Sequence, residues 1–157
     1  VQREHNALPH NLRKTKVYAV IDTNVLVSAM LKWDSVPGTI LQLTFGGVIV
    51  PVFNDAILAE YRTVLSRPKF HFTEDIINTV LDEITRLGIF AETEKLEEEL
   101  PDPKDRVFYE VTLGERKEED AFLVTGNIKH FPLVSFVVTP RQMLSIVYKN
   151  LTEVEQQ

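Results

Sequence analysis

Short apolar runs that alternate with helical patterns constrain this fold more than any other feature of the chain. Residues 17–21 (VYAVI) form such a run, rich in β-branched side chains. Runs of this kind form strands that are buried on both faces, as in parallel sheets. Further strands are expected at residues 48–52, 121–125 and 134–139, and a weaker one at residues 89–92. Strands that alternate with helices predict an α/β fold around a largely parallel sheet.

Polar side chains that suit the N-cap position stand before several of the segments between these strands. Asp102 is the clearest, because Pro103 after it favours the first position of a helix. Other segments carry apolar residues at helical spacing. From these signals we expect helices at residues 24–31, 39–45, 55–66, 74–87, 103–113 and 141–148.

The length of 157 residues suits a single domain, which we expect to span residues 17–149. Residues 1–16 are expected to be a flexible segment or a remnant of cloning, and residues 150–157 a C-terminal tail. No apolar stretch approaches the ~20 residues that cross a bilayer, so no membrane contact is expected. The absence of cysteine excludes disulfides and thiolate metal ligands, and it suits a reducing cytoplasm.

One aspartate interrupts the apolar run VYAVIDTNVLVSAML. Asp22 directly follows the first strand, and its neighbours in the run are almost all apolar. An ionised carboxylate avoids such surroundings unless it is paired or coordinates a metal. The alternative is that Asp22 only caps the helix that follows. We treat it as the first candidate for a functional site.

Three other polar side chains are expected near Asp22. Sites in parallel α/β sheets form beyond the carboxyl ends of the strands, where the strand order reverses. Asn127 follows the strand at residues 121–125, Asp105 lies in the first turn of the helix that opens at Pro103, and Glu60 lies at the edge of an apolar helical stripe.

Each of these residues also has a purely structural interpretation. Glu60 could pair with Arg62 or Arg67 on its own helix. Asp105 could simply stabilise the positive end of its helix, and Asn127 could be a turn residue after Gly126.

Carboxylates that are held close together repel one another, so they need protons or a cation at neutral pH. With no cysteine and only four histidines, the suitable cation is a hard one that binds oxygen. The sequence therefore predicts a site for Mg²⁺ or Mn²⁺.

Four stretches of the chain together resemble the PIN-domain proteins. These are VIDTNVLVSAML, the helix that carries Glu60 ahead of LSRPKF, the stretch DPKDRVFYE, and LVTGNIKHFP. The resemblance covers roughly residues 16–148 and is closest to the small prokaryotic branch described as toxin components of toxin–antitoxin modules. It implies a three-layer α/β/α sandwich with a mainly parallel sheet.

The resemblance also implies an activity, the metal-dependent cleavage of RNA. Three or four acids would surround one or two Mg²⁺ or Mn²⁺ ions, and cleavage would leave 5′-phosphate and 3′-hydroxyl ends. By the motif, the first acid is Asp22, the second is Glu60 and the third is Asp105. We expect these three to be both metal ligands and catalytic residues.

The fourth acidic position is where this chain departs from the family pattern. Many relatives have an aspartate where this chain has Asn127, and an amide adds no negative charge to a metal site. This substitution should weaken the binding of a second cation. The acids that could substitute for it are Asp102, Glu110 and Asp120, and the polar residues expected to orient the carboxylates are Thr23, Asn24 and Thr125.

The charge of the chain argues against binding nucleic acid by electrostatics alone. The net charge is −6, and residues 92–120 hold twelve acids against five bases. Affinity for nucleic acid of that kind comes from Lys and Arg displacing counterions. The basic residues that could contact RNA phosphates beside the site are Arg62, Arg67, Lys69, His71, Lys129 and His130.

Two functions remain open from the sequence. The first is a metal-dependent ribonuclease, a toxin whose antitoxin would insert an Arg or Lys into the acidic pocket. The second is a module with the same fold that binds RNA or a partner without cutting. Aromatic residues in the segment Phe70-His71-Phe72 would suit a homodimer.

Overall fold

The structure is a computed structural model that describes residues 16–91, 93, 100 and 102–155. Within these residues, five parallel strands form one sheet in the order β3-β2-β1-β4-β5. The strands are β1 (Val17–Ile21), β2 (Ile49–Phe53), β3 (Ile89–Phe90), β4 (Ala121–Val124) and β5 (Val137–Val138).

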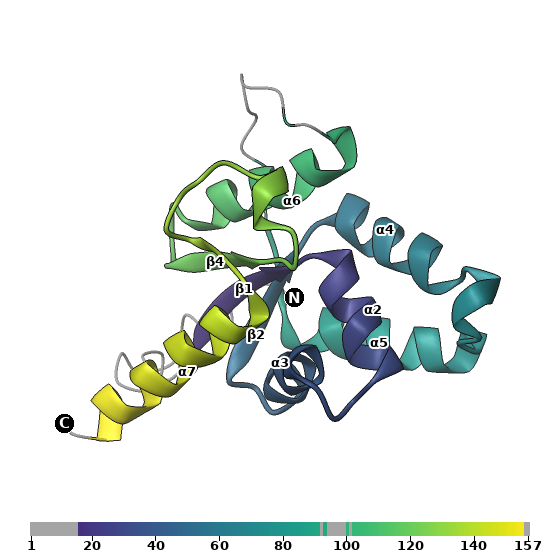
Figure 1. Cartoon of the computed structure of the whole chain (residues 1–157), viewed down its shortest axis with the longest axis horizontal. Helices are drawn as coiled ribbons and strands as arrows, with labels where there is room; N and C mark the ends of the chain where they lie inside the picture. The colour runs from purple at the N-terminus through teal and green to yellow at the C-terminus, as the bar shows by residue number, and fades with distance from the viewer. Residues whose placement is uncertain (1–15, 92, 94–99, 101, 156–157) are drawn as a thin grey trace.

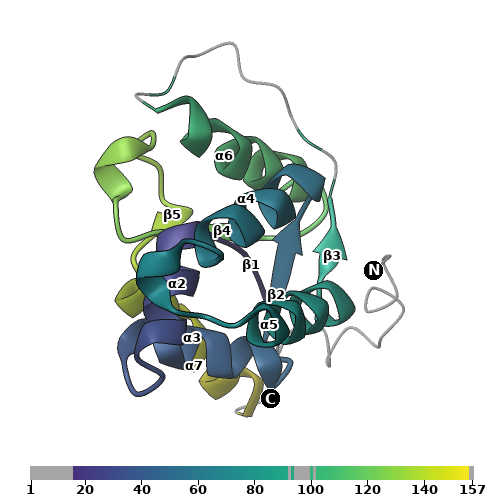
Figure 2. The same cartoon turned by 90° about the vertical axis from the view of Figure 1, so that its right-hand side faces the viewer.

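Six α-helices surround the sheet in the described part of the chain. They are α2 (Thr23–Leu31), α3 (Val36–Phe45), α4 (Asp55–Leu65), α5 (Glu74–Leu87), α6 (Pro103–Glu115) and α7 (Pro140–Glu155). Helix α6 covers one face of the sheet, and α3 and α7 cover the other (Figures 1 and 2). Helices α2, α4 and α5 lie to the right of the strands in Figure 1. The predicted α/β sandwich with a parallel sheet is confirmed.

Local side-chain chemistry begins several helices as predicted. The Asn54 side chain accepts a hydrogen bond from the backbone N–H of Ile57, and the Thr73 side chain accepts one from Ile76. The Asp102 carboxylate accepts one from the backbone N–H of Lys104. These bonds satisfy N–H groups that have no partner inside the first turn of a helix.

Three elements have a boundary that differs from the prediction by three residues or more. Helix α3 begins three residues early, because the Ser35 side chain caps it and accepts a bond from the N–H of Gly38. Strand β5 has two residues rather than six, since the chain before it turns and exposes Leu133. Helix α7 runs past the predicted end at Tyr148 to Glu155, into the predicted tail, because no Gly or Pro stops it. The predicted N-terminal segment lies outside the described residues except for Lys16.

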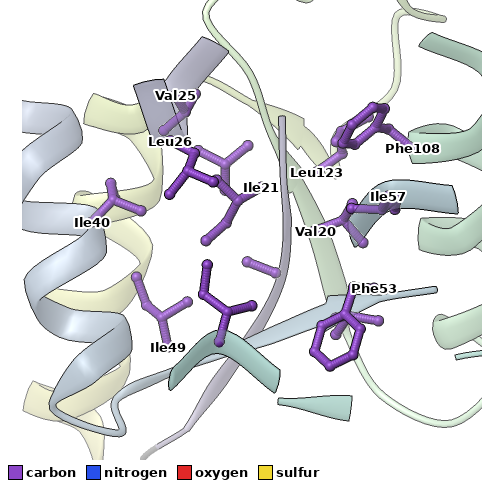
Figure 3. Close-up of a cluster of buried hydrophobic side chains, with 14 of the residues drawn as sticks. Val20, Ile21, Val25, Leu26, Ile40, Ile49, Phe53, Ile57, Phe108 and Leu123 are labelled. Atoms are coloured by element: carbon purple, nitrogen blue, oxygen red, sulfur yellow. The ribbon is translucent and has the colours of Figure 1, made fainter. Parts of the chain in front are cut away.

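The hydrophobic core lies on both sides of β1. Figure 3 shows Val20 and Ile21 on opposite sides of the strand, as the period of two in a strand requires. Val20 lies with Ile57 and Phe53, and Ile21 lies with Val25 and Leu26. All five residues of β1 are buried, which explains why its sequence is apolar without alternation.

The strand order reverses beside β1, which pairs with β2 on one side and with β4 on the other. The backbone N–H of Asp22 continues the pairing with β4 by donating to the carbonyl of Val124 at 2.9 Å. Asp22 and Thr125 therefore leave the sheet next to each other. This edge is where ligands bind in open α/β sheets.

Candidate functional site

A pocket of about 140 Å³ opens beside this edge of the sheet. It brings together the starts of α2 and α6 and one side of α4. The residues that line it are Asp22, Thr23, Asn24, Glu60, Val64, Arg67, Asp102, Lys104, Asp105 and Phe108. The three acids that the sequence predicted for one site, Asp22, Glu60 and Asp105, thus line one pocket.

Asp22 is a buried carboxylate that does not cap its helix through its side chain. It occupies the N-cap position of α2 but makes no capping side-chain hydrogen bond, and only 5% of the residue is exposed. Its Oδ2 instead accepts a hydrogen bond from the Thr125 hydroxyl at 2.7 Å, and that hydroxyl accepts one from the backbone N–H of Asn127. The structure therefore gives the Asp22 carboxylate an orientation that capping would not require.

Burial raises the pKa of Asp22 above its ordinary value. The Thr125 hydroxyl, the backbone N–H groups of Thr23 and Asn24, and the nearby His130 oppose this shift of the pKa without cancelling it. A carboxylate in this position is costly in its charged form unless a cation compensates it.

Asp105 is the second carboxylate of the pocket with a raised pKa. Burial raises its pKa most, and the neighbouring charges of Asp22 and Asp102 raise it further. Its Oδ2 is buried and receives no hydrogen bond. The Nδ1 of His130 lies 3.4 Å from that oxygen and lowers the pKa. Asp22 and Asp105 are therefore close enough to repel each other.

Glu60 lies on α4 and is half-buried at the side of the pocket. No ion pair joins its carboxylate to Arg62 or Arg67 among the described side chains, so the structural interpretation of Glu60 is not observed. Arg67 lines the pocket from the turn that follows α4, and Lys104 lines it from the start of α6. The pocket thus combines an acidic floor with two cationic side chains.

The side chains that line the pocket offer oxygen atoms, the donors that a hard cation prefers. Within the part of the chain that the structure describes, no three His, Cys, Asp or Glu side chains are grouped closely enough to hold one metal ion. The pocket does contain two buried oxygens without a hydrogen-bond partner, Oδ2 of Asp105 and Oγ1 of Thr23. Mg²⁺ is commonly held by one or two carboxylates and several waters, and Asp22 and Asp105 are the two carboxylates of this pocket that could hold it.

The acids proposed to replace a fourth ligand differ in position. Asp102 caps α6 and also lines the pocket. Glu110 lies 3.6 Å from the guanidinium of Arg106, and Asp120 lies 3.7 Å from Arg116 with 95% of its side chain exposed. Neither of these two acids is among the residues that line the pocket.

Asn127 does not reach the pocket with its side chain. The residue is exposed at the start of a short 3-10 helix, Ile128–His130, and only its backbone N–H joins the network through Thr125. The interpretation of Asn127 as a turn residue agrees with this placement. Thr23 and Asn24 line the pocket.

The predicted RNA-contacting residues are divided between the pocket and the surface. Arg67 lines the pocket, and His130 lies against Asp105. Arg62 donates a hydrogen bond to Asn78, Lys69 lies over the ring of Phe70, and Lys129 is exposed. His71 has a left-handed backbone with φ of 58°.

Two residues near the site were not predicted from the sequence. Lys104 lines the pocket, and its signal was its place between Asp102 and Asp105 at the start of a helix. Phe108 closes the pocket and shows no sequence signal beyond ordinary apolar spacing. In the segment proposed to suit a homodimer, Phe70 and Phe72 are half-buried and stack on each other, with ring centroids 5.9 Å apart.

The sequence matches the model of a known protein family. The model of the PIN domain matches residues 18–129, a range that includes Asp22, Glu60 and Asp105. This range is well over half of the chain. The chain belongs to the PIN-domain family.

PIN domains are generally nucleases, they typically use divalent metal ions, and they bind RNA and often pair with antitoxins. This PIN domain is 29% identical over 119 residues to the uncharacterized protein MJ1680 of Methanocaldococcus jannaschii. The aligned region covers 74% of each of the two chains. No solved structure matches it. Among the described residues, no helix is both long and apolar enough to cross a membrane.

The raised pKa of Asp22 predicts how the metal-free PIN domain responds to pH. The folded state binds this proton more tightly than the unfolded state, so the charged carboxylate weakens folding. This weakening is absent below the ordinary pKa of 3.8, grows as the pH rises through the raised pKa, and is complete above it. Each pKa unit corresponds to about 1.4 kcal/mol.

Asp22→Asn should therefore match the parent in unfolding free energy near pH 3 and exceed it at pH 7, as measured by urea unfolding without divalent ions. Glu83→Gln is the control of opposite sign, because the hydrogen bond from Arg86 lowers the pKa of Glu83. Its carboxylate contributes stability above the ordinary pKa, and that contribution is lost as the pH falls. A pH-independent effect of Asp22→Asn would contradict the burial of its charge.

Proposed function

We propose that this PIN domain is an endoribonuclease that requires Mg²⁺ or Mn²⁺. The observation that carries the proposal is the convergence of Asp22, Glu60 and Asp105 on one pocket. Two of these carboxylates have raised pKa values, and one of their oxygens lacks a hydrogen-bond partner. Such an arrangement is costly without a ligand, and burial of like charges of this kind is common at active sites.

Asp22 and Asp105 would hold the ion, with Glu60 at the side of the pocket. A bound Mg²⁺ or Mn²⁺ supplies charge neutralisation at the phosphate and a lowered pKa for water. Thr125 keeps the Asp22 carboxylate oriented through its 2.7 Å hydrogen bond. Glu60 is placed to accept the proton of an attacking water, since its carboxylate is not engaged in an ion pair with Arg62 or Arg67.

The two cationic side chains would bind the substrate. Arg67, just beyond the end of α4, and Lys104, at the start of α6, both line the pocket, and a phosphodiester between them would be in contact with positive charge from both. The acidic floor alone would repel such a substrate. The same surface could receive an Arg or Lys side chain of an antitoxin, which would make this PIN domain the toxin of a toxin–antitoxin pair.

A binding module without cleavage activity is the second candidate. It is favoured by the lack of a three-carboxylate metal group among the described residues and by the exposed side chain of Asn127. In both respects, less negative charge is available at the pocket to bind a second ion. The two candidates differ in whether a bound cation leads to cleavage of RNA.

Mn²⁺ should stabilise the folded protein and activate it. At a concentration of about 100 times its dissociation constant, a ligand that binds only the folded state adds about 2.7 kcal/mol to the unfolding free energy. The measurements are thermal melting with Mn²⁺ at pH 7 and at pH 4, and cleavage of a labelled single-stranded RNA. We expect stabilisation at pH 7, less at pH 4 because burial raises the pKa of Asp22 and Asp105 and protons then compete with the ion, and Mn²⁺-dependent cleavage.

The same experiment separates the candidates. Stabilisation without cleavage would favour the binding module. Neither stabilisation nor cleavage would refute the proposed metal site.

A further inference from the structure

Tyr61 connects α4, the helix that carries Glu60, to β1, the strand that precedes Asp22. It follows Glu60 on α4, and only 2% of the residue is exposed. Its hydroxyl donates a 2.5 Å hydrogen bond to the backbone carbonyl of Ile21, the last residue of β1 and the neighbour of Asp22. The hydrogen bond joins residues 40 positions apart in the sequence, and it holds α4 against the carboxyl end of β1.

The pairing of the strands explains why the Ile21 carbonyl needs a donor outside the sheet. The register between β1 and β2 ends at Ala19 and Pro51, whereas β1 stays paired with β4 up to Ile21 and Val124. The carbonyl at the end of β1 is buried, and buried carbonyls need a donor. The Tyr61 hydroxyl provides one where the pairing with β2 has ended.

The ring of Tyr61 contacts the third acidic segment. Its centroid lies 6.3 Å from that of Phe108, at an interplanar angle of 46°. Phe108 lines the pocket and follows Asp105 by three residues on α6, so the two side chains lie on the same side of that helix. One buried residue therefore contacts or adjoins the segments that carry Asp22, Glu60 and Asp105.

We propose that Tyr61 is a positioning residue that sets the spacing of these three acids, and this inference rests on the proposed function. Tyr61 does not line the pocket, so it acts through the residues that do. Residues that orient metal ligands typically change metal affinity or activity by 10–100-fold when they are replaced.

The test is Tyr61→Phe, which removes the hydroxyl and keeps the ring against Phe108. The expected result is a Mn²⁺ affinity at least about tenfold weaker by calorimetry, and a reduced kcat with an RNA KM close to that of the parent. A loss of stability alone would not separate kcat from KM in this way. Tyr18→Phe is the matched control, because Tyr18 is a buried tyrosine on β1 that does not line the pocket, and it should leave both quantities unchanged.

A double-mutant cycle shows whether Tyr61 acts through the spacing of the acids. In a Glu60→Gln background, Tyr61→Phe should lower kcat less than it does in the parent, because the carboxylate proposed to accept the proton, which Tyr61 positions, is gone. Equal effects in both backgrounds would overturn the inference. If Tyr61→Phe melts too low to assay, Phe108→Leu tests the contact to α6 and should weaken Mn²⁺ binding in the same direction.

The outcomes distinguish the inference from the proposed function. An active parent with a Tyr61→Phe variant of equal Mn²⁺ affinity and kcat overturns the role of Tyr61 alone. A parent that neither binds Mn²⁺ nor cleaves RNA overturns the proposed function, and the positioning role with it.

Discussion

Asp22→Asn should abolish the metal-dependent cleavage of RNA and leave the protein folded. The substitution removes one of two carboxylates proposed as direct ligands of the ion. Replacing a residue that merely orients a ligand typically costs 10–100-fold, so we expect a loss of at least about a hundredfold here. The measurement is the cleavage rate of a labelled RNA with saturating Mn²⁺, together with a circular dichroism spectrum of each protein.

The structure explains why unfolding should not account for this loss. An amide oxygen at position 22 can still accept the hydrogen bond from the Thr125 hydroxyl, and asparagine is a good N-cap for α2. Asp120→Asn is the matched control, since Asp120 is exposed beside Arg116 and does not line the pocket. Cleavage by Asp22→Asn at the rate of the parent would show that the pocket is not the active site.

Phe53→Ala should cost about 3–5 kcal/mol of unfolding free energy, as is typical for a fully buried phenylalanine. Phe53 ends β2, is 0% exposed and lies among Val20 and Ile57 in the core (Figure 3). Its ring meets the ring of Phe90 edge-on at 6.3 Å. A side chain at Gly88 would come within 2.5 Å of the same ring, so the space around it is closely filled.

The free energy is measured by urea unfolding at constant pH. Phe90→Ala is the matched control, because it removes the other phenyl ring of this contact. Phe90 is 43% exposed. That variant should lose far less stability, since much of its ring is already in water. Equal losses for both variants would show that β3 contributes more to the core than its short length indicates.

The elements of the fold could largely be predicted from the sequence, because their signals are local. Residues 17–21 read as a buried strand, and all five are buried in β1. Polar side chains were expected to cap several helices, and Asn54, Thr73 and Asp102 each do so. Strand β5 was predicted too long, because the chain makes a turn at residues 135–136 directly before it.

The site could be predicted only in part. Asp22 was evident because it is a charge within an apolar run, and Asp105 and Glu60 came from the resemblance to PIN domains. Lys104 and Tyr61 were missed, since nothing in their local sequence separates a pocket residue from a surface lysine or a core tyrosine. Glu110, Asp120 and Asn127 were all plausible ligands by charge or position, and the structure keeps their side chains out of the pocket.

The sequence by itself determined the layers of this protein and the place of Asp22 at the end of the first strand, because side-chain period and capping act over a few residues. The tertiary structure decided which oxygens remain without a partner and which acids meet. Those properties depend on contacts such as Thr125 to Asp22 and Tyr61 to Ile21, which join residues 103 and 40 positions apart. Distances between such remote segments are set by the packing of helices on the sheet, which no local pattern records.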